Sequence, residues 1–135
     1  MASTFFDSRH ICCKINKNAR STRHVFSRFA IKGDFMDRIA IIDLGSNSIR
    51  FIVMQIGEQG SYKLIYQEKK SIRLAEGMTQ ETRLLTEEAQ ERALKCLTVY
   101  AHIIEVQKVK KVLAVATAAV RNAVNGASFL KRVHM

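Results

Sequence analysis

A short stretch of small and acidic residues carries the clearest chemical signal in this chain of 135 residues. It reads Asp-Leu-Gly-Ser-Asn-Ser from Asp43, and Gly45 followed by small polar residues predicts a tight turn whose N–H groups can cradle phosphate oxygens. Ser46, Asn47 and Ser48 add neutral donors. Asp43 is suited to hold Mg2+ through water or to orient an attacking water. The same residues also fit an ordinary hairpin turn that Asp43 caps and whose polar side chains bond locally.

A second anion site is expected at Ala-Thr-Ala-Ala-Val-Arg, which begins at Ala116, where a buried strand turns into a helix. Thr117 would donate through its hydroxyl, and Arg121 would reach back with its guanidinium fork from about one turn into the helix. The alternative is a Thr N-cap followed by a solvated Arg. Arg73, in Ser-Ile-Arg-Leu-Ala-Glu-Gly, is a third and weaker candidate, whose ordinary interpretation is an exposed loop Arg.

Three successive strands are expected to position the first motif. Residues 38–43 form a short apolar run ending at the acidic residue, which predicts a buried strand. Residues 49–56 are a second β-branched and aromatic run, residues 57–60 mark a hairpin turn, and residues 61–69 alternate as a third strand. Consecutive strands of this kind imply an antiparallel meander.

A helix and a fourth strand are expected to position the second motif. Thr86 can cap a helix of about 20 residues with one apolar stripe, and residues 111–116 read as another buried strand. Because a helix separates the strands, this one is expected to run parallel to the first through a right-handed crossover. Asn125 is expected to cap a final short helix from Gly126 to Val133.

Length and composition limit the class of protein. The chain is 47% hydrophobic and 25% charged, as in globular domains, and its length predicts one domain. The longest apolar run, residues 112–116, is far shorter than the roughly 18 residues of a membrane span. No secretory h-region is present before residue 38, so a cytoplasmic protein without a membrane partner is expected.

Residues 1–37 are predicted to form a basic extension ahead of the domain at residues 38–135. Up to Arg38 there are eight basic and three acidic residues, which is half of the net charge of +10. A nucleic-acid-binding arm, an organelle transit peptide and a disordered or ancillary extension all fit this composition. The last is favoured because the phenylalanines keep no helical or strand period, so nucleic acid is not expected as a partner. The adjacent Cys12 and Cys13 lack the spacing of a zinc site with His10 and His24.

The order of the motifs resembles the start of the exopolyphosphatase/guanosine pentaphosphate phosphatase (Ppx/GppA) family. Asp-Leu-Gly-Ser-Asn-Ser, Arg-Leu-Ala-Glu-Gly, Leu-Thr-Glu-Glu-Ala and Ala-Thr-Ala-Ala-Val-Arg-Asn follow one another as in that family, from about residue 38 to residue 133. The resemblance implies an α/β fold: a partial lobe of the ribonuclease-H-like, actin-like ATPase superfold, with a three-strand antiparallel meander, a helix and a parallel strand in one mixed sheet. It gives Asp43 the metal role with Mg2+ as cofactor, and the candidate phosphate-binding residues are Gly45, Ser46, Asn47, Ser48, Thr117, Arg121 and Arg73.

The sequence departs from the family's pattern at two points. Ala118 stands where the family usually has Ser, which removes a hydroxyl donor but leaves the backbone amide. The family's general base is a Glu in Ser-Gly-x-Glu-Glu-Ala, and its second phosphate loop is Asp-x-Gly-Gly-Gly-Ser. Both are expected beyond Met135, so no catalytic residue is assigned within the chain.

The function implied by the resemblance is release of orthophosphate from inorganic polyphosphate or guanosine pentaphosphate by a protein of which this chain is the N-terminal fragment. The alternative is a non-catalytic truncated product that binds polyanions through its basic surface. A kinase or chaperone-type ATPase of the same superfold fits less well, because Gly-Ser-Asn-Ser differs from the Gly-Thr and Gly-Gly loops of those proteins. Self-association is expected as well, because an apolar strand at a sheet edge invites pairing with another chain.

Deleting residues 1–35 should leave the melting temperature of the domain unchanged and weaken its retention on immobilised polyphosphate, because the extension adds positive charge and no patterned apolar face. Thermal unfolding and salt elution of both forms check this. A melting temperature that collapses on deletion would show that the extension packs into the core.

Overall fold

A computed structural model describes residues 37–57 and 60–134, so residues 1–36 of the predicted extension, with its cysteines, lie outside the described residues. Its elements follow the expected order along the chain. They are β1 (Arg38–Leu44), β2 (Ser48–Ile56), β3 (Tyr62–Ser71), α1 (Glu87–Val106), β4 (Lys111–Ala116), α2 (Ala118–Asn122) and α3 (Gly126–His134).

The strands form one mixed sheet in the order β3-β2-β1-β4. β1 pairs antiparallel with β2 and parallel with β4, and β2 pairs antiparallel with β3, so the predicted meander and parallel strand are confirmed. β3 continues to Ser71, two residues beyond the predicted end at residue 69. Within the described residues β4 lies at a sheet edge, and the expected self-association through that edge stays a prediction.

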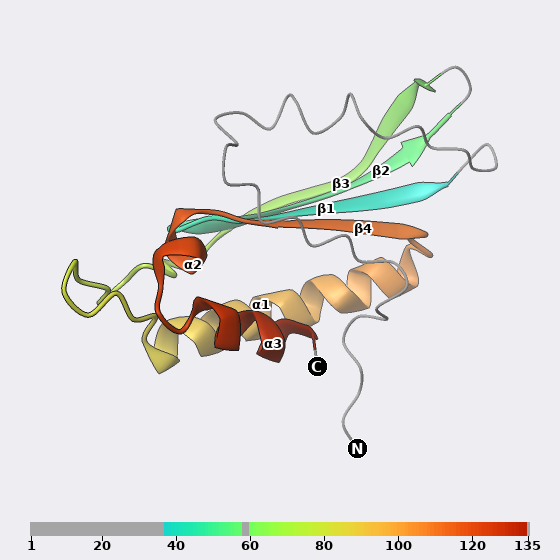
Figure 1. Cartoon of the computed structure of the whole chain (residues 1–135). Coiled ribbons are helices and arrows are strands. Elements are labelled where there is room, and N and C mark those ends of the chain that lie inside the picture. The colour runs from blue at the N-terminus through green and yellow to red at the C-terminus, as the bar shows by residue number, and fades with distance from the viewer. Residues whose placement is uncertain (1–36, 58–59, 135) are drawn as a thin grey trace.

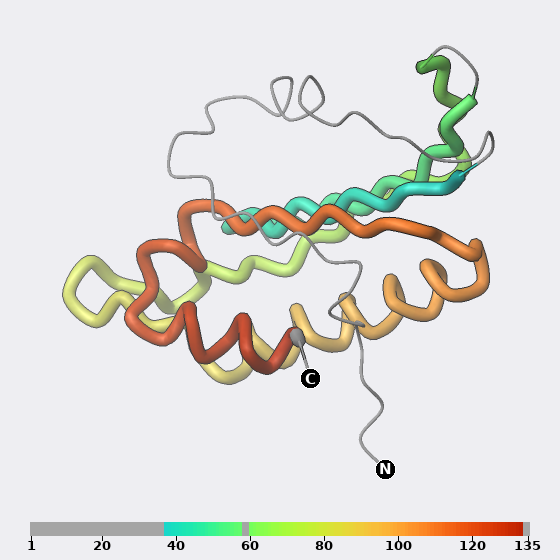
Figure 2. The backbone as a smooth tube through the Cα atoms, turned by 45° about the vertical axis from the view of Figure 1, so that its right-hand side comes forward, coloured from blue at the N-terminus to red at the C-terminus, as the bar shows by residue number. Residues whose placement is uncertain are grey.

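Both α1 and α3 lie on one face of the sheet, and α2 lies at the end where β4 finishes (Figure 1). The tube view from another angle shows the same two layers (Figure 2). No helix of the described part is long and apolar enough to cross a membrane.

The core fills the space between the sheet and α1. α1 begins after Thr86, whose hydroxyl accepts from the Ala89 N–H at 3.3 Å, with acidic residues in the first turn as the helix dipole favours. Its buried positions recur at helical spacing, which confirms the predicted stripe. They pack on alternate residues of the strands, and the buried set includes Ala40, Ile42, Leu44, Ile49, Phe51, Val53, Ala89, Ala93, Leu97, Tyr100 and Val112.

A polar contact, rather than a helix cap, fixes the start of α3. The Asn125 amide accepts from the Leu85 N–H and donates to the Leu85 carbonyl, both at 2.9 Å. The prediction that its side chain caps the final helix is therefore wrong, because those polar groups bind a loop 40 residues away. Arg132 further along α3 binds Gln90 at 2.9 Å and Glu87 at 2.6 Å on α1.

Aromatic stacking stabilises the middle of the core. The rings of Phe51 and Tyr100 stack with centroids 4.4 Å apart and an interplanar angle of 18°, and Tyr66 lies at 5.7 Å from Phe51 in a tilted arrangement. Tyr100 is fully buried, and its hydroxyl has no partner of good geometry within the described residues. Burial, with Cys96 and Glu68 as polar neighbours, raises the pKa of Tyr100.

Tyr100→Phe should therefore keep or slightly raise the free energy of unfolding, because it removes a buried polar atom without a partner and keeps the ring stack. Tyr100→Ala, the matched deletion of the whole ring, should lower it by about 3–5 kcal/mol. Urea unfolding of the two variants measures both. A loss of stability in Tyr100→Phe as large as that in Tyr100→Ala would contradict this view of the hydroxyl.

Candidate phosphate-binding site

The first motif lies in the turn between β1 and β2, as the sequence predicts. Gly45 donates its N–H to the Ser48 carbonyl at 3.0 Å, which closes the turn around Ser46 and Asn47. A Cβ on Gly45 would lie 2.8 Å from the Ser48 carbonyl oxygen, closer than side chains tolerate. Glycine is needed here because of this close approach.

The carbonyl groups of the turn are held by one other segment. Ser46 accepts from the Ala75 N–H at 3.0 Å. Asn47 accepts from the N–H groups of both Ile72 and Arg73, at 2.9 and 2.8 Å. Residues 72–75, which directly follow β3, therefore hold one side of the turn.

This arrangement sets the direction of the N–H groups. A planar trans peptide points its N–H opposite to its C=O. Because the carbonyls of Ser46 and Asn47 point to residues 72–75, the N–H groups of Asn47 and Ser48 point to the other side of the turn. Among the turn and loop hydrogen bonds of the described residues, neither N–H donates to another backbone group. The turn thus presents N–H donors of the kind that bind anions.

Asp43 lies at the end of β1 directly before this turn. Its Oδ1 is buried and has no hydrogen-bond partner among the described residues. Burial raises the pKa of Asp43, and the charge of Arg50 acts in the opposite direction. The alternative in which Asp43 caps the turn is therefore wrong for Oδ1, because this oxygen accepts no hydrogen bond from the described residues.

Arg50 is a neighbour of the site that the sequence analysis missed. It is the cross-strand partner of Asp43 in the β1–β2 register, so both side chains lie on the same face of the sheet. Lys69 of β3 is the register partner of Arg50 on its other side, and both cations are exposed. Counting residues on both sides of the predicted turn would have found this row, because antiparallel pairs follow from the turn length.

Thr117 lies beside the turn, and its hydroxyl binds a backbone carbonyl. Both its N–H and its Oγ1 donate to the Leu44 carbonyl, at 3.0 and 3.1 Å. It makes no side-chain cap to α2. The alternative of a side-chain cap to α2 is therefore wrong, whereas the role of this hydroxyl as an anion donor stays a prediction. Thr117 instead ties the end of β4 to the start of the turn.

Arg121 lies one turn further on, and its N–H bonds the Thr117 carbonyl at 3.1 Å. Its helix, α2, has only five residues, so the helix itself contributes little dipole at this place. The Arg121 side chain is exposed on this short helix.

Arg73 is brought directly to the turn by the hydrogen bond between its N–H and Asn47. Its side chain is exposed, as an ordinary loop Arg would be, but its backbone has a φ of 51°, which is rare for a residue with a side chain. The structure therefore places Arg73 and Thr117 on two sides of the Asp43–Ser48 motif.

The donor set around Asp43 fits Mg2+ in one respect. An unpartnered buried carboxylate oxygen is a suitable ligand, and Mg2+ is typically bound by one or two carboxylates together with water and phosphate oxygens. The described residues hold no group of three or more His, Cys, Asp or Glu that would make a complete protein cage. Such an ion would therefore depend on the substrate's own phosphates.

Comparisons with known proteins agree with the family resemblance. The model of the Ppx/GppA phosphatase family matches residues 52–135. A guanosine-5'-triphosphate,3'-diphosphate pyrophosphatase of Photobacterium profundum is 37% identical over 94 residues, which cover 69% of this chain and 18% of that protein. A Haemophilus influenzae protein assigned as an exopolyphosphatase is 38% identical over 94 residues, covering 70% of this chain and 28% of the relative. The chain thus spans less than a third of the length of these relatives.

Solved structures show the same relation. The Aquifex aeolicus member of the Ppx/GppA family has a TM-score of 0.68 at 37% identity, covering 73% of this chain and 31% of that one. An exopolyphosphatase from Cytophaga hutchinsonii has a TM-score of 0.67 at 30% identity, covering 72% and 30%. These likenesses confirm the predicted fold class, a partial lobe with a mixed sheet. With the family model matching most of the described sheet and helices, the chain belongs to the Ppx/GppA phosphatase family.

Proposed function

We propose that this chain supplies the first phosphate-binding turn of a hydrolase that releases orthophosphate, with Mg2+, from inorganic polyphosphate or guanosine pentaphosphate. The observation that carries the proposal is the orientation of the Asp43–Ser48 turn, whose carbonyls are held on one side so that N–H groups face the other. Backbone donors fixed in this way stabilise phosphate charge without reorganising. The names of the relatives support the substrate class.

Each residue has a distinct part in this proposal. The N–H groups of Asn47 and Ser48 bind terminal phosphate oxygens, and the exposed Arg73 and Arg121 add positive charge. Asp43 holds Mg2+, which when bound neutralises charge on the phosphate oxygens. Phosphoryl transfer depends mainly on positioning and electrostatic stabilisation, and this turn supplies only part of both. The general base is proposed to lie in a part of the whole protein outside this chain.

The alternative, a polyanion-binding protein without catalysis, is favoured by the net charge of +10. It differs from the first proposal in a measurable way. Binding by diffuse charge weakens steeply with salt and does not depend on the shape of one turn.

Gly45→Ala is the variant that separates these two proposals. Its Cβ would force the Ser48 carbonyl to move, and losing one charge-assisted hydrogen bond of about 1.5–3 kcal/mol should weaken tripolyphosphate binding at least about tenfold. Gly57→Ala is the matched control, because a Cβ there also makes a close contact, 2.6 Å from Ser61 Oγ, but Gly57 follows the end of β2 that lies away from the site. Titration calorimetry with tripolyphosphate and Mg2+ should show weakened affinity only in Gly45→Ala. Equal affinity in both variants, with strong salt dependence, would support the polyanion-binding alternative.

The isolated chain should release almost no phosphate from polyphosphate in the presence of Mg2+. General acid/base catalysis contributes roughly 10²–10⁴ in rate, and no general base is assigned within the chain. A coupled phosphate-release assay with the purified chain measures the rate. Turnover in the range of an ordinary enzyme, roughly 1–10³ per second, would show that the chain carries its own general base.

Asp43→Asn tests the metal role through stability. The raised pKa of Asp43 means that its neutral form is favoured in the fold, so ionisation opposes folding as the pH rises through the folded-state pKa. Without metal, the variant should melt at a higher temperature than the unchanged chain at pH 7. The difference should shrink toward pH values below the ordinary pKa of 3.8. Mg2+ with tripolyphosphate should raise the melting temperature of the unchanged chain more than that of the variant.

Glu105→Gln, which neutralises an exposed carboxylate on α1, is the control for the change in charge. It should behave like the unchanged chain in every condition. A stabilisation by Mg2+ and tripolyphosphate that is equal in Asp43→Asn and the unchanged chain would contradict a metal role for Asp43.

A further inference from the structure

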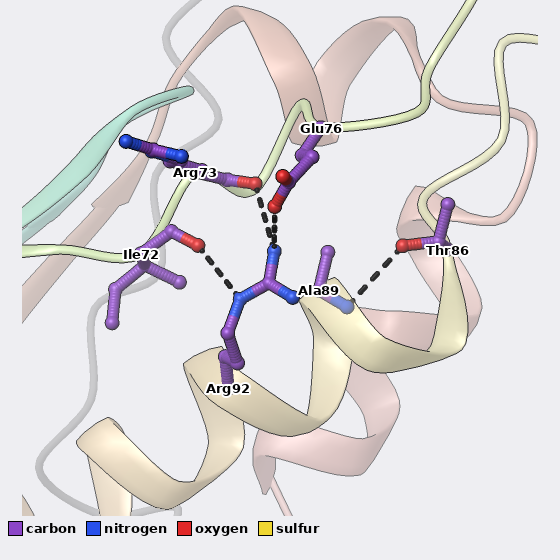
Figure 3. A network of polar contacts seen from close by, with 6 residues as sticks. All are labelled: Ile72, Arg73, Glu76, Thr86, Ala89 and Arg92. Carbon is purple, nitrogen blue, oxygen red and sulfur yellow. Dashed lines mark hydrogen bonds and ion pairs between the residues drawn. The ribbon is translucent and has the colours of Figure 1, made fainter.

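A single arginine of α1 holds the segment that supports the turn. Arg92 donates from Nε to the Ile72 carbonyl at 3.1 Å and from Nη2 to the Arg73 carbonyl at 3.3 Å. The same Nη2 donates to Glu76 Oε2 at 2.6 Å. Figure 3 shows the guanidinium between these three acceptors, with Thr86 and Ala89 at the start of the same helix.

The segment that Arg92 binds also supports the turn on its other side. The peptide groups of Ile72 and Arg73 donate their N–H to Asn47 and direct their carbonyls to Arg92. The Glu76 N–H adds a bond to the Arg73 carbonyl at 3.0 Å. Residues 72–76 therefore form one layer of backbone between α1 and the β1–β2 turn, and a shift of Arg92 would be transmitted to the Asn47 carbonyl.

Arg73 itself is held in a strained conformation. A φ of 51° costs a residue with a side chain about 1–2 kcal/mol, and such a conformation persists where the surroundings fix it. Figure 3 shows the Arg73 side chain extending away from Arg92. Within the described residues its guanidinium makes no hydrogen bond, whereas its backbone N–H and carbonyl are both engaged. Hydrogen bonds thus hold the strained backbone of Arg73 without engaging its charged group.

The ion pair with Glu76 contributes too little to be the main role of Arg92. The Arg92 and Glu76 side chains are 42% and 54% exposed, and pairs of this kind contribute only about 0–1 kcal/mol. A guanidinium that donates to two backbone carbonyls and a carboxylate provides geometry that an ammonium cannot, because its donors have a fixed planar fork. The contacts therefore indicate a role in placing the backbone.

We infer that Arg92 is a positioning residue for phosphate binding: it holds residues 72–76, which fix the direction of the turn's N–H groups and carry the Arg73 guanidinium. This inference rests on the proposed function of the turn. It adds to the site a residue of α1 that lies outside the three phosphate motifs in the sequence.

The test compares Arg92→Lys with Arg132→Lys in the full 135-residue chain. Arg132 is the matched control, since it also forms a 2.6 Å ion pair to an exposed Glu of α1 and binds a further polar group, but these partners lie on α1 and not in residues 72–76. Tripolyphosphate affinity is measured by calorimetry for both variants, for Arg73→Ala and for the double variant Arg92→Lys/Arg73→Ala. Amide hydrogen exchange is measured at Ile72, Arg73 and Ala75.

Arg92→Lys should weaken tripolyphosphate binding about tenfold, the loss of roughly one charge-assisted hydrogen bond, and Arg132→Lys less than about twofold. In the double variant the Arg92 change should weaken binding less than it does alone, because one of the two groups that Arg92 positions is already removed. Fully additive losses, or unchanged affinity in Arg92→Lys, would overturn the inference.

Amide exchange separates this inference from the proposed function. Arg92→Lys should speed exchange at Ile72, Arg73 and Ala75, while exchange in the middle of α1 stays unchanged in both Lys variants. If the unchanged chain does not bind tripolyphosphate, the proposed phosphate site is wrong. The role of Arg92 in phosphate binding is then wrong as well. Unchanged exchange at the three amides in Arg92→Lys would overturn the inference that Arg92 holds residues 72–76, whether or not tripolyphosphate binds.

Discussion

The hydrogen bonds that residues 72–75 donate to the carbonyls of Ser46 and Asn47 are the constraint on which the site depends. Without them the Asp43–Ser48 sequence is an ordinary hairpin turn, free to direct its peptide groups either way. With them, peptide planarity forces the following N–H groups to the opposite side. The turn joins β1 to β2, and the donors lie in the segment that follows β3. Arg92 of α1 binds the carbonyls of that same segment. A local motif thus becomes an anion-binding geometry through contacts that are distant in sequence.

The sequence predicted the elements well because their signals are local. Apolar runs bounded by turn residues marked all four strands, and the stripe on α1 with its Thr86 cap marked the helix. The helix caps considered for the side chains of Thr117 and Asn125 were wrong. Their short polar side chains bind the Leu44 carbonyl and the Leu85 backbone, contacts that become visible only when β4 lies beside β1 and α3 beside α1. Local propensity cannot choose between a cap and a long-range partner.

The candidate site was predicted only in part, for a related reason. The types and order of the residues from Asp43 to Ser48 predicted a turn. Arg50 and Arg92 carried no such signal, because an Arg in a strand and an Arg in a helix read as solvated cations. Register makes Arg50 the neighbour of Asp43, and the path of the chain after β3 brings two carbonyls within reach of Arg92. Residues that act by holding backbone leave little trace in a single sequence.

The central claim is that the N–H groups of the β1–β2 turn bind phosphate. Its most direct test is the ¹H–¹⁵N spectrum of the 135-residue chain during titration with tripolyphosphate and Mg2+. New hydrogen bonds to phosphate oxygens should shift the amide protons of Asn47 and Ser48 downfield, saturably and together. Shifts confined to the exposed lysines and arginines of the surface, with both turn amides unmoved at saturation, would contradict the account.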